Sequence, residues 1–153
     1  MATFADNKKA RFDYEFLQKF EAGISLLGHE VKSVRASRAD LTGSYVVVRG
    51  GEAFLVGATI QPYQVLNINR DHANSYNPDR PRKLLLSRKE LDLLAKEEST
   101  KGLTLVPISL YNKGRNIKLS FAIARGKKKF DKREKIKERD SKRDVARTLK
   151  NQY

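Results

Sequence analysis

The stretch LTLVPISLYNKGRNIKLSFAIA, residues 103–124, predicts a β-hairpin. Its second half alternates isoleucine, leucine and phenylalanine with lysine and serine, the period of two of a strand that buries one face. The intervening residues 112–115 include Asn and Gly, which tolerate the positive φ of a turn. We therefore expect paired strands over 103–111 and 117–124, with Lys118 pointing away from the buried face.

A second hairpin is expected around a Gly-Gly pair. The β-rich runs 45–48 and 53–56 flank residues 49–52, Arg-Gly-Gly-Glu, a typical hairpin turn. Upstream, the run 11–27 opens with aromatic residues alternating with acidic ones, which favours a further strand. Gly23 interrupts that run, and we expect a bend or bulge there.

Two helices are expected between the strands. Valines three residues apart favour a short helix over 28–36. Ser87 followed by Glu90 forms a capping box, and an apolar stripe comes after it, so a second helix is expected to start there. Residues 84–86 read as a buried strand, and 61–82, rich in Pro and Asn, as a loop. Many short strands with few helices indicate a mainly β fold, an OB-like antiparallel β-barrel with flanking helices.

The charge is strongly positive and unevenly distributed. The 153 residues hold 32 Lys+Arg against 18 Asp+Glu, a net charge of +14. Residues 125–153 carry 13 basic and 5 acidic residues, more than half of that excess. We therefore divide the chain into an RNA-binding barrel, 1–126, and a basic C-terminal tail, 127–153. Such a charge points to a polyanion, most commonly nucleic acid. No apolar run approaches the roughly 20 residues of a membrane span, so we expect no membrane partner.

The basic tail has charges spaced for a helix but no apolar stripe. Asp131 with Lys135, and Glu138 with Lys142, are i,i+4 pairs in the favourable order. A helix that is polar on all sides is unstable alone, so we expect the tail to be disordered when free and helical against RNA phosphates. Phe130 stands among cations, where an aromatic ring can stack on a base. A merely solubilising tail, and docking of this ring on the barrel, remain alternatives.

No catalytic motif is recognisable. The two histidines, His29 and His72, are far apart in sequence, and cysteine is absent, which fits a reducing cytosol and gives a metal site little support. Carboxylates such as Glu21 and Glu52 form no spaced motif, although a nuclease on such a barrel stays an alternative. We expect no enzyme activity, no metal and no cofactor. From the residues alone, a generic OB-fold RNA chaperone or ribosomal protein is equally open.

Four segments resemble one family. NKKARFDYEF, EAGISLLGHEVKS, PRKLLLSRKEL and GKKKFDKREKIKERD are similar to the SmpB family, and the resemblance runs from Asn7 to about Lys150. It implies a cytoplasmic, monomeric, non-catalytic adaptor that binds the tRNA-like domain of transfer-messenger RNA. It implies delivery of that RNA to stalled ribosomes with elongation factor Tu, while the tail occupies the empty mRNA channel and the small-subunit decoding centre.

The resemblance also implies site residues. Lys32 and Arg35 share a helix face in the GHEVKS segment and are expected to contact phosphates. For Leu85, a core position and a contact with RNA are both open, and Glu21 is expected to orient a nearby Arg or to accept from a ribose hydroxyl. The RNA-binding residues implied are Asn7, Lys8, Lys9, Glu21, Lys32, Arg35, Leu85 and Lys118. The tail residues implied at the ribosome are Lys127, Lys128, Lys129, Phe130, Asp131, Lys132 and Arg133.

Overall fold

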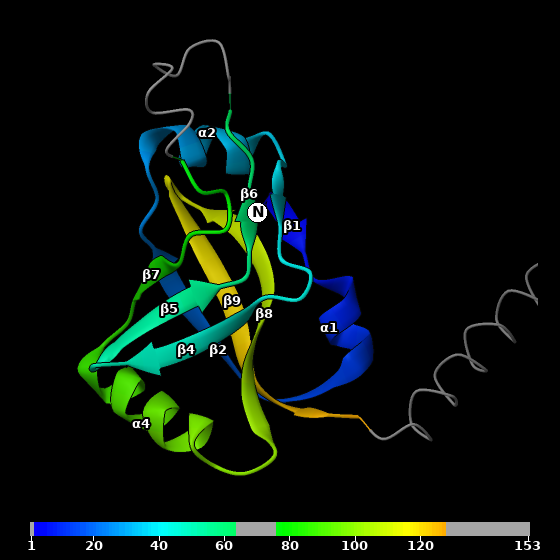
Figure 1. Cartoon of the computed structure of the whole chain (residues 1–153), viewed down its shortest axis with the longest axis vertical. Coiled ribbons are helices and arrows are strands. Elements are labelled where there is room, and N and C mark those ends of the chain that lie inside the picture. Colours follow the sequence, from blue (N-terminus) through cyan, green and yellow to red (C-terminus); the bar gives the residue numbers. More distant parts are fainter. Residues whose placement is uncertain (1, 64–75, 128–153) are drawn as a thin grey trace, which may run out of the picture.

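The computed structural model describes residues 2–63 and 76–127, and Figure 1 shows strands wrapped around one core with helices at the periphery. The helices are α1 (Lys8–Asp13), α2 (Gly28–Arg35) and α4 (Arg88–Glu98). The strands are β1 (Thr3–Asp6), β2 (Tyr14–Ile24), β3 (Ala39–Asp40), β4 (Tyr45–Arg49), β5 (Glu52–Val56), β6 (Thr59–Ile60), β7 (Arg82–Leu85), β8 (Leu103–Lys113) and β9 (Asn116–Gly126).

The main sheet closes on itself. Its antiparallel order is β1-β8-β4-β5-β7-β2-β9, and an additional pairing of β8 with β9 joins the ends into a ring, leaving β1 outside on β8. The expected mainly β, barrel-like fold with flanking helices is therefore confirmed. Strand β9 ends at Gly126. Within the described residues, the helices are too short or too polar to span a bilayer.

Both expected hairpins are present, and glycine explains each turn. Arg49 pairs with Glu52 in the first, and the intervening Gly50 and Gly51 have φ of 61° and 74°, as in a type I′ turn. In the second, strands β8 and β9 join through a two-residue turn whose first residue, Gly114, has φ of 62°. A side chain at any of these glycines would strain the backbone.

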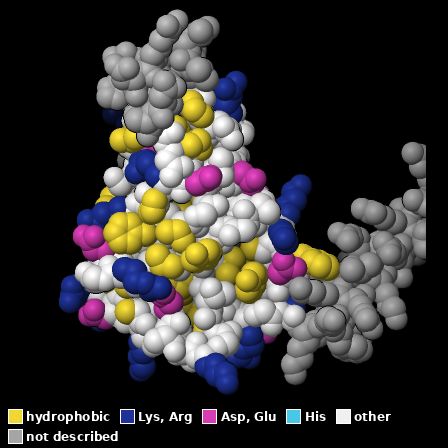
Figure 2. Space-filling view, viewed as in Figure 1, with side chains coloured by type: hydrophobic (Ala, Val, Ile, Leu, Met, Phe, Trp, Pro, Cys, Tyr) yellow, Lys and Arg dark blue, Asp and Glu magenta, His cyan; other side chains and the backbone are white. Residues whose placement is uncertain are grey.

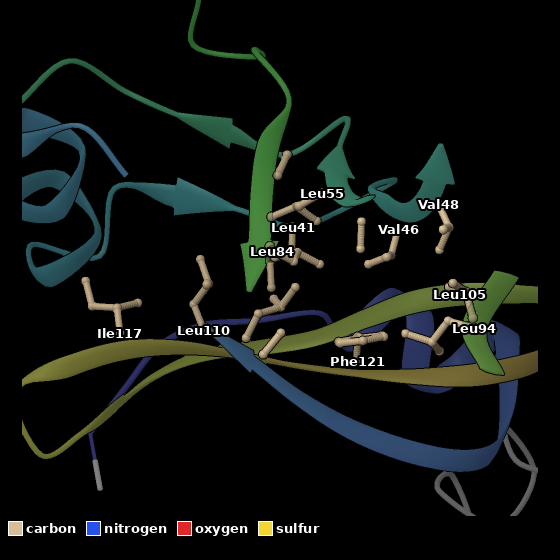
Figure 3. Packing of buried hydrophobic residues seen from close by; sticks show 14 of the residues in the cluster. Leu41, Val46, Val48, Leu55, Leu84, Leu94, Leu105, Leu110, Ile117 and Phe121 are labelled. Atoms are coloured by element: carbon tan, nitrogen blue, oxygen red, sulfur yellow. The ribbon is translucent and has the colours of Figure 1, made fainter. Parts of the chain in front are cut away.

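The core lies inside the ring. Leucines from β5, β7 and β8 meet Phe121 of β9, as Figure 3 shows, with side chains from opposite walls pointing toward one another. Leu119 and Phe121 are fully buried and Ile117 is 8% exposed, so the alternation read in β9 is confirmed. Helix α4 adds Leu94, and its capping box is present: Ser87 Oγ accepts from the Glu90 amide at 3.3 Å.

The N-terminal segment differs from expectation. Residues 8–13 are helical, so β2 begins at Tyr14 and the alternation read from position 11 is partly wrong. The cause is Asn7, whose side-chain oxygen accepts from the Ala10 amide at 3.2 Å and starts α1. The bulge in β2 falls near Leu17, between Phe16 and Gln18, and not at Gly23.

Strand β7 also corrects the sequence reading. Its residues alternate in burial, so Leu84 is 2% exposed while Leu85 is 58% exposed. The three leucines 84–86 therefore do not form a continuously buried run. One face of β7 packs on the core, and the other is open to solvent.

Candidate nucleic-acid interface

One row of cross-strand partners brings distant sequence segments together on the outside of the barrel. Leu85 on β7 pairs with Gly23 on β2, Gly23 pairs with Lys118 on β9, and Lys118 pairs with Tyr111 on β8. Directly opposed residues in antiparallel strands point to the same face of a sheet. The row therefore places the Leu85 and Lys118 side chains on one outer face, separated by a glycine.

Gly23 allows Leu85 to lie close to the sheet. A Cβ atom at Gly23 would lie 3.3 Å from both Cβ and Cδ1 of Leu85, closer than ordinary van der Waals contact. The glycine thus serves a close side-chain approach and not a bend. Because Leu85 is mostly exposed, the reading of it as core is wrong, whereas its contact with RNA stays a prediction.

A groove of about 340 Å³ follows this row. It contains three of the residues implied for RNA binding, namely Arg35, Leu85 and Lys118, which come from α2, β7 and β9. Both apolar and cationic side chains line it. The lining residues are Gly23, Ile24, Leu26, Val31, Arg35, Leu85, Arg115, Asn116, Ile117 and Lys118.

Arg35 ties α2 to the tip of the β8–β9 hairpin. Its guanidinium donates to Asn112 Oδ1 at 3.3 Å and to the Arg115 carbonyl at 3.2 Å, and it lies 5.9 Å from the Phe4 ring centroid. The side chain is nevertheless exposed, so the guanidinium is held in place while it faces solvent. Lys32 does not line the groove; its ammonium lies 6.0 Å from the ring of Tyr63.

Glu21 joins two side chains of β8. Its Oε1 accepts from Lys113 Nζ at 2.9 Å, and its Oε2 accepts from the Tyr111 hydroxyl. These hydrogen bonds, that of Tyr111 first, lower the pKa of the Glu21 carboxyl. Burial, and the hydrogen bond to this carboxylate, raise the pKa of Tyr111. The basic partner of Glu21 is therefore a lysine, Lys113, and not the arginine that was expected, while contact of Glu21 with a ribose hydroxyl stays a prediction.

The N-terminal residues lie at a different place. Asn7 is 2% exposed, and both its side-chain polar atoms are used: Nδ2 donates to the Pro107 carbonyl at 2.9 Å, and Oδ1 caps α1. Lys8 and Lys9 are exposed on α1, and Lys9 lines a second hollow of about 240 Å³ together with Tyr45. The structure therefore does not bring every implied residue into one site.

A buried charge cluster anchors α2 behind the groove. Glu30 and Arg82 are both fully buried, and Arg82 donates from Nε at 3.0 Å and from Nη2 at 2.6 Å to Oε2 of Glu30. Arg80 also donates to this carboxylate, and the Tyr76 hydroxyl lies 2.9 Å from it. Burial alone would raise the pKa of Glu30, but the hydrogen bonds from Arg80, the Leu27 amide, Arg82 and Tyr76 lower it to about 2.

The carboxylates that a nuclease would need lie apart in the described part of the chain. Glu21 is bound by Lys113, and Glu52 is paired with Lys83 at 3.0 Å. Across residues 2–63 and 76–127, no group of three or more His, Cys, Asp or Glu side chains is arranged to hold a metal ion.

The tail residues from Lys128 to Arg133 lie outside the described residues, as does His72. Lys127 is described, and its backbone amide donates to the Asp13 carbonyl at 2.9 Å. Its ammonium donates to the Arg11 carbonyl at 3.3 Å, so Lys127 lies against the end of α1. The face seen in Figure 2, over β4 and β5, mixes basic and acidic side chains around an apolar centre and so shows no uniform basic patch.

Gly23, which lines the groove, and Tyr111 and Lys113, which are paired with groove residues, were not identified from the sequence. Gly23 was interpreted as a bend, and Tyr111 and Lys113 were read only as part of a hairpin. A signal for the latter two did exist. Tyr111 and Lys113 are two residues apart, hence on one face of β8, and the hairpin turn sets Tyr111 opposite Lys118.

Comparisons with known proteins give matches along nearly the whole chain. The family model described as SmpB protein matches residues 4–151. The SsrA-binding protein of Microcystis aeruginosa is 48% identical over 145 residues, covering 95% of this chain and 92% of the relative. That of Chloroflexus aggregans is 49% identical over 150 residues, covering 98% and 92%. A chain from the solved structure "tmRNA-SmpB: a journey to the center of the bacterial ribosome" superimposes with a TM-score of 0.66 at 43% identity, covering 81% of this chain and 84% of that chain.

Proposed function

The chain belongs to the SmpB family, and from that membership we propose that it is the RNA-binding adaptor of trans-translation. It binds the tRNA-like domain of transfer-messenger RNA and acts with that RNA on the bacterial ribosome. The observation that carries this function is the high identity to SsrA-binding proteins along nearly the whole chain, together with the fold shared with the tmRNA-SmpB structure. A generic OB-fold RNA chaperone or ribosomal protein is not favoured by these relationships.

The groove supports a specific mode of RNA binding. Lys118 and Arg35 bring positive charge to the groove, and the exposed Leu85 offers an apolar surface in it. Phosphate contacts position a nucleic acid, whereas an unstacked base can lie on an apolar or aromatic side chain. We therefore assign phosphate contacts to Arg35 and Lys118 and a base contact to Leu85.

The remaining implied residues take separate roles. Lys8 and Lys9 contact phosphates from α1, and Asn7 acts through their placement, because its own polar atoms are engaged within the protein. Lys32 adds positive charge from α2. This division accounts for both an exposed lysine pair and a buried asparagine in one short motif.

The tail and the further partners complete the proposal. Residues 127–153 enter the empty mRNA channel and the decoding centre, becoming helical there, with Lys127 to Arg133 as contacts and Phe130 stacking on a base. Elongation factor Tu brings the charged RNA together with this protein. The adaptor works as a monomer in the cytoplasm and has no catalytic activity, because the RNA and the ribosome perform the chemistry.

A binding titration tests the RNA specificity. The purified chain is titrated with the tRNA-like domain of transfer-messenger RNA and with an ordinary tRNA, each at two salt concentrations, because non-specific binding is strongly salt-dependent. Preference for the first RNA at the higher salt is expected. Equal affinities that fall together with salt would instead indicate a generic basic RNA binder.

Truncation after Gly126 tests the division between barrel and tail. The shortened chain is expected to keep nearly all affinity for the tRNA-like domain and to lose tagging on stalled ribosomes in a reconstituted translation reaction. The full-length chain carrying Lys118→Ala is the complementary control, because its tail is intact but its RNA binding should be weaker. A large loss of RNA affinity on truncation would contradict this division.

A further inference from the structure

We propose that Glu21 is a positioning residue that holds the ammonium of Lys113 beside the groove, where Lys113 binds an RNA phosphate. This inference rests on the proposed function and adds Lys113 and Tyr111 to the RNA-binding surface. It also explains why an acidic side chain belongs on a surface that faces a polyanion.

The three side chains meet on the outer face that carries the groove. Glu21 reaches Lys113 Nζ at 2.9 Å and the Tyr111 hydroxyl through its other oxygen. Tyr111 is the cross-strand partner of Lys118, and Lys113 is the partner of Asn116, and both partners line the groove. Lys113 therefore stands next to the groove rim, and 57% of its side chain is exposed.

The bond to Glu21 leaves Lys113 able to bind an anion. An ammonium has three donors, and one of them is directed at Oε1 of Glu21, so the others are available to phosphate oxygens. A free lysine loses conformational freedom on binding, whereas one already held in place loses less. The negative charge of Glu21 weakens the attraction of this surface for phosphate. In return, Glu21 reduces the conformational entropy that Lys113 loses when it binds RNA.

The local charge still favours RNA. Lys113 and Lys118 both act electrostatically on the Glu21 carboxylate, and Arg35 and Arg115 add positive charge in the neighbouring groove. The Tyr111 hydroxyl and the Lys113 ammonium both donate to that carboxylate, which spreads its negative charge. The competing interpretation is direct acceptance of a ribose hydroxyl by Glu21, and it leads to a different result in the experiment below.

The experiment is a double-mutant cycle in the full-length chain, with the tRNA-like domain of transfer-messenger RNA as the probe. Glu21→Ala is expected to weaken binding by about tenfold, the equivalent of one charged hydrogen bond. Lys113→Met should give a similar loss and reduce the salt dependence by about one charge. In the double variant, Glu21→Ala should add little, because Lys113 is no longer there to be positioned.

A conservative variant and a matched control separate position from charge. Glu21→Gln keeps an oxygen that accepts from Lys113, so it should retain most of the affinity that Glu21→Ala loses. Simple electrostatics predicts instead that both substitutions tighten binding, since each removes a negative charge. Asp92→Asn removes an exposed acid that pairs with Arg88 on α4, outside the groove, and should leave binding to the probe unchanged.

The outcomes are distinguishable. Unchanged or tighter binding of Glu21→Ala would overturn the positioning role. If the losses of affinity from Glu21→Ala and Lys113→Met add fully in the double variant, Glu21 itself contacts RNA, and the positioning role is overturned as well. Failure of the wild-type chain to prefer the tRNA-like domain would contradict the proposed function, irrespective of the cycle. All variants are compared by urea unfolding, where an exposed pair should have little effect.

Discussion

Arg82 directs two donors, Nε and Nη2, at the same carboxylate oxygen of Glu30, and both residues are completely buried. Glu30 lies on α2 and Arg82 begins β7, so this pair fixes the helix to the barrel wall. The Leu27 amide donates to the other oxygen of Glu30 at 2.8 Å, which also caps the start of α2. The position of Arg35 at the groove therefore depends on a buried ion pair at the other end of α2.

Removal of the Glu30 charge should destabilise the fold strongly. In Glu30→Gln, Arg82 keeps its charge but loses its ionic partner in a site from which water is excluded. Breaking a buried pair in this way costs about 3–5 kcal/mol. Urea unfolding measures the effect, and Asp92→Asn, in an exposed pair with Arg88, serves as the control with an expected change below about 1 kcal/mol. Equal stability of the two variants would contradict an anchoring role for Glu30.

The same residue predicts a pH dependence of stability. The folded-state pKa of Glu30 is about 2, below its ordinary value of 4.5. The unfolded chain therefore binds the proton more tightly, and Glu30 stabilises the fold fully above about pH 5. That contribution, about 3 kcal/mol from the difference in pKa, is lost as the pH falls from 4.5 toward 2.

Urea midpoints of the wild-type chain and Glu30→Gln, measured between pH 6 and pH 2.5, check this dependence. The difference in unfolding free energy between the two should be constant near neutrality and shrink in acid. A difference that stays the same at pH 2.5 would show that the pKa of Glu30 is not lowered. Other carboxylates titrate in both proteins, so the comparison isolates Glu30.

Local patterns in the sequence predicted the hairpins, because Gly50, Gly51 and Gly114 mark turns that need positive φ. The Ser87 capping box likewise acts over only three residues. The beginning of α1 was misread, since alternating aromatic residues at 12–16 imitate a strand while the decisive signal is one asparagine cap. Hydrophobic periodicity therefore predicted strands well where no cap competed with it.

The groove was only partly predictable, because its residues meet through strand pairing. The family resemblance named Leu85 and Lys118, but nothing local showed that Gly23 lies between them. Glu30 and Arg82 are 52 positions apart, and charged side chains, which are almost never fully buried unless paired, do not themselves indicate burial. Predicting such long-range partners requires the order and register of the strands in the barrel. Sequence patterns predict only that the fold is a barrel.

The C-terminal end of α2 offers a stabilising substitution. Ser37 has φ of 59°, the left-handed conformation that costs a residue with a Cβ about 1–2 kcal/mol. Its amide donates to the Val34 carbonyl and the next amide to the Ser33 carbonyl, both at 2.9 Å, the hydrogen-bond pattern in which glycine is preferred. Ser37→Gly should raise the unfolding free energy by about 0.5–1 kcal/mol, after the entropy of glycine in the unfolded chain is subtracted.

Thermal or urea unfolding measures the gain, and Ala36→Gly is the control. Ala36 has φ of −88°, so glycine there brings no relief and should lower the stability by up to about 1 kcal/mol. Opposite signs at two neighbouring positions are expected. A loss in Ser37→Gly would mean that the serine side chain itself stabilises the turn.

Leu84 and Leu85 provide a matched test of the groove, because they are adjacent and chemically identical but face opposite sides of β7. Leu84 is 2% exposed in the core, so Leu84→Ala should cost about 2–5 kcal/mol of stability. Leu85 is 58% exposed and lies over Gly23, so Leu85→Ala should change stability by less than about 1 kcal/mol.

RNA binding should show the reverse order, because in Leu85→Ala a base that rests on Leu85 loses its apolar support. Urea unfolding and titration with the tRNA-like domain of transfer-messenger RNA, both on the folded variants, measure the two effects. Wild-type affinity in Leu85→Ala would exclude a base contact at Leu85 and leave the phosphate contacts of Arg35 and Lys118 in place.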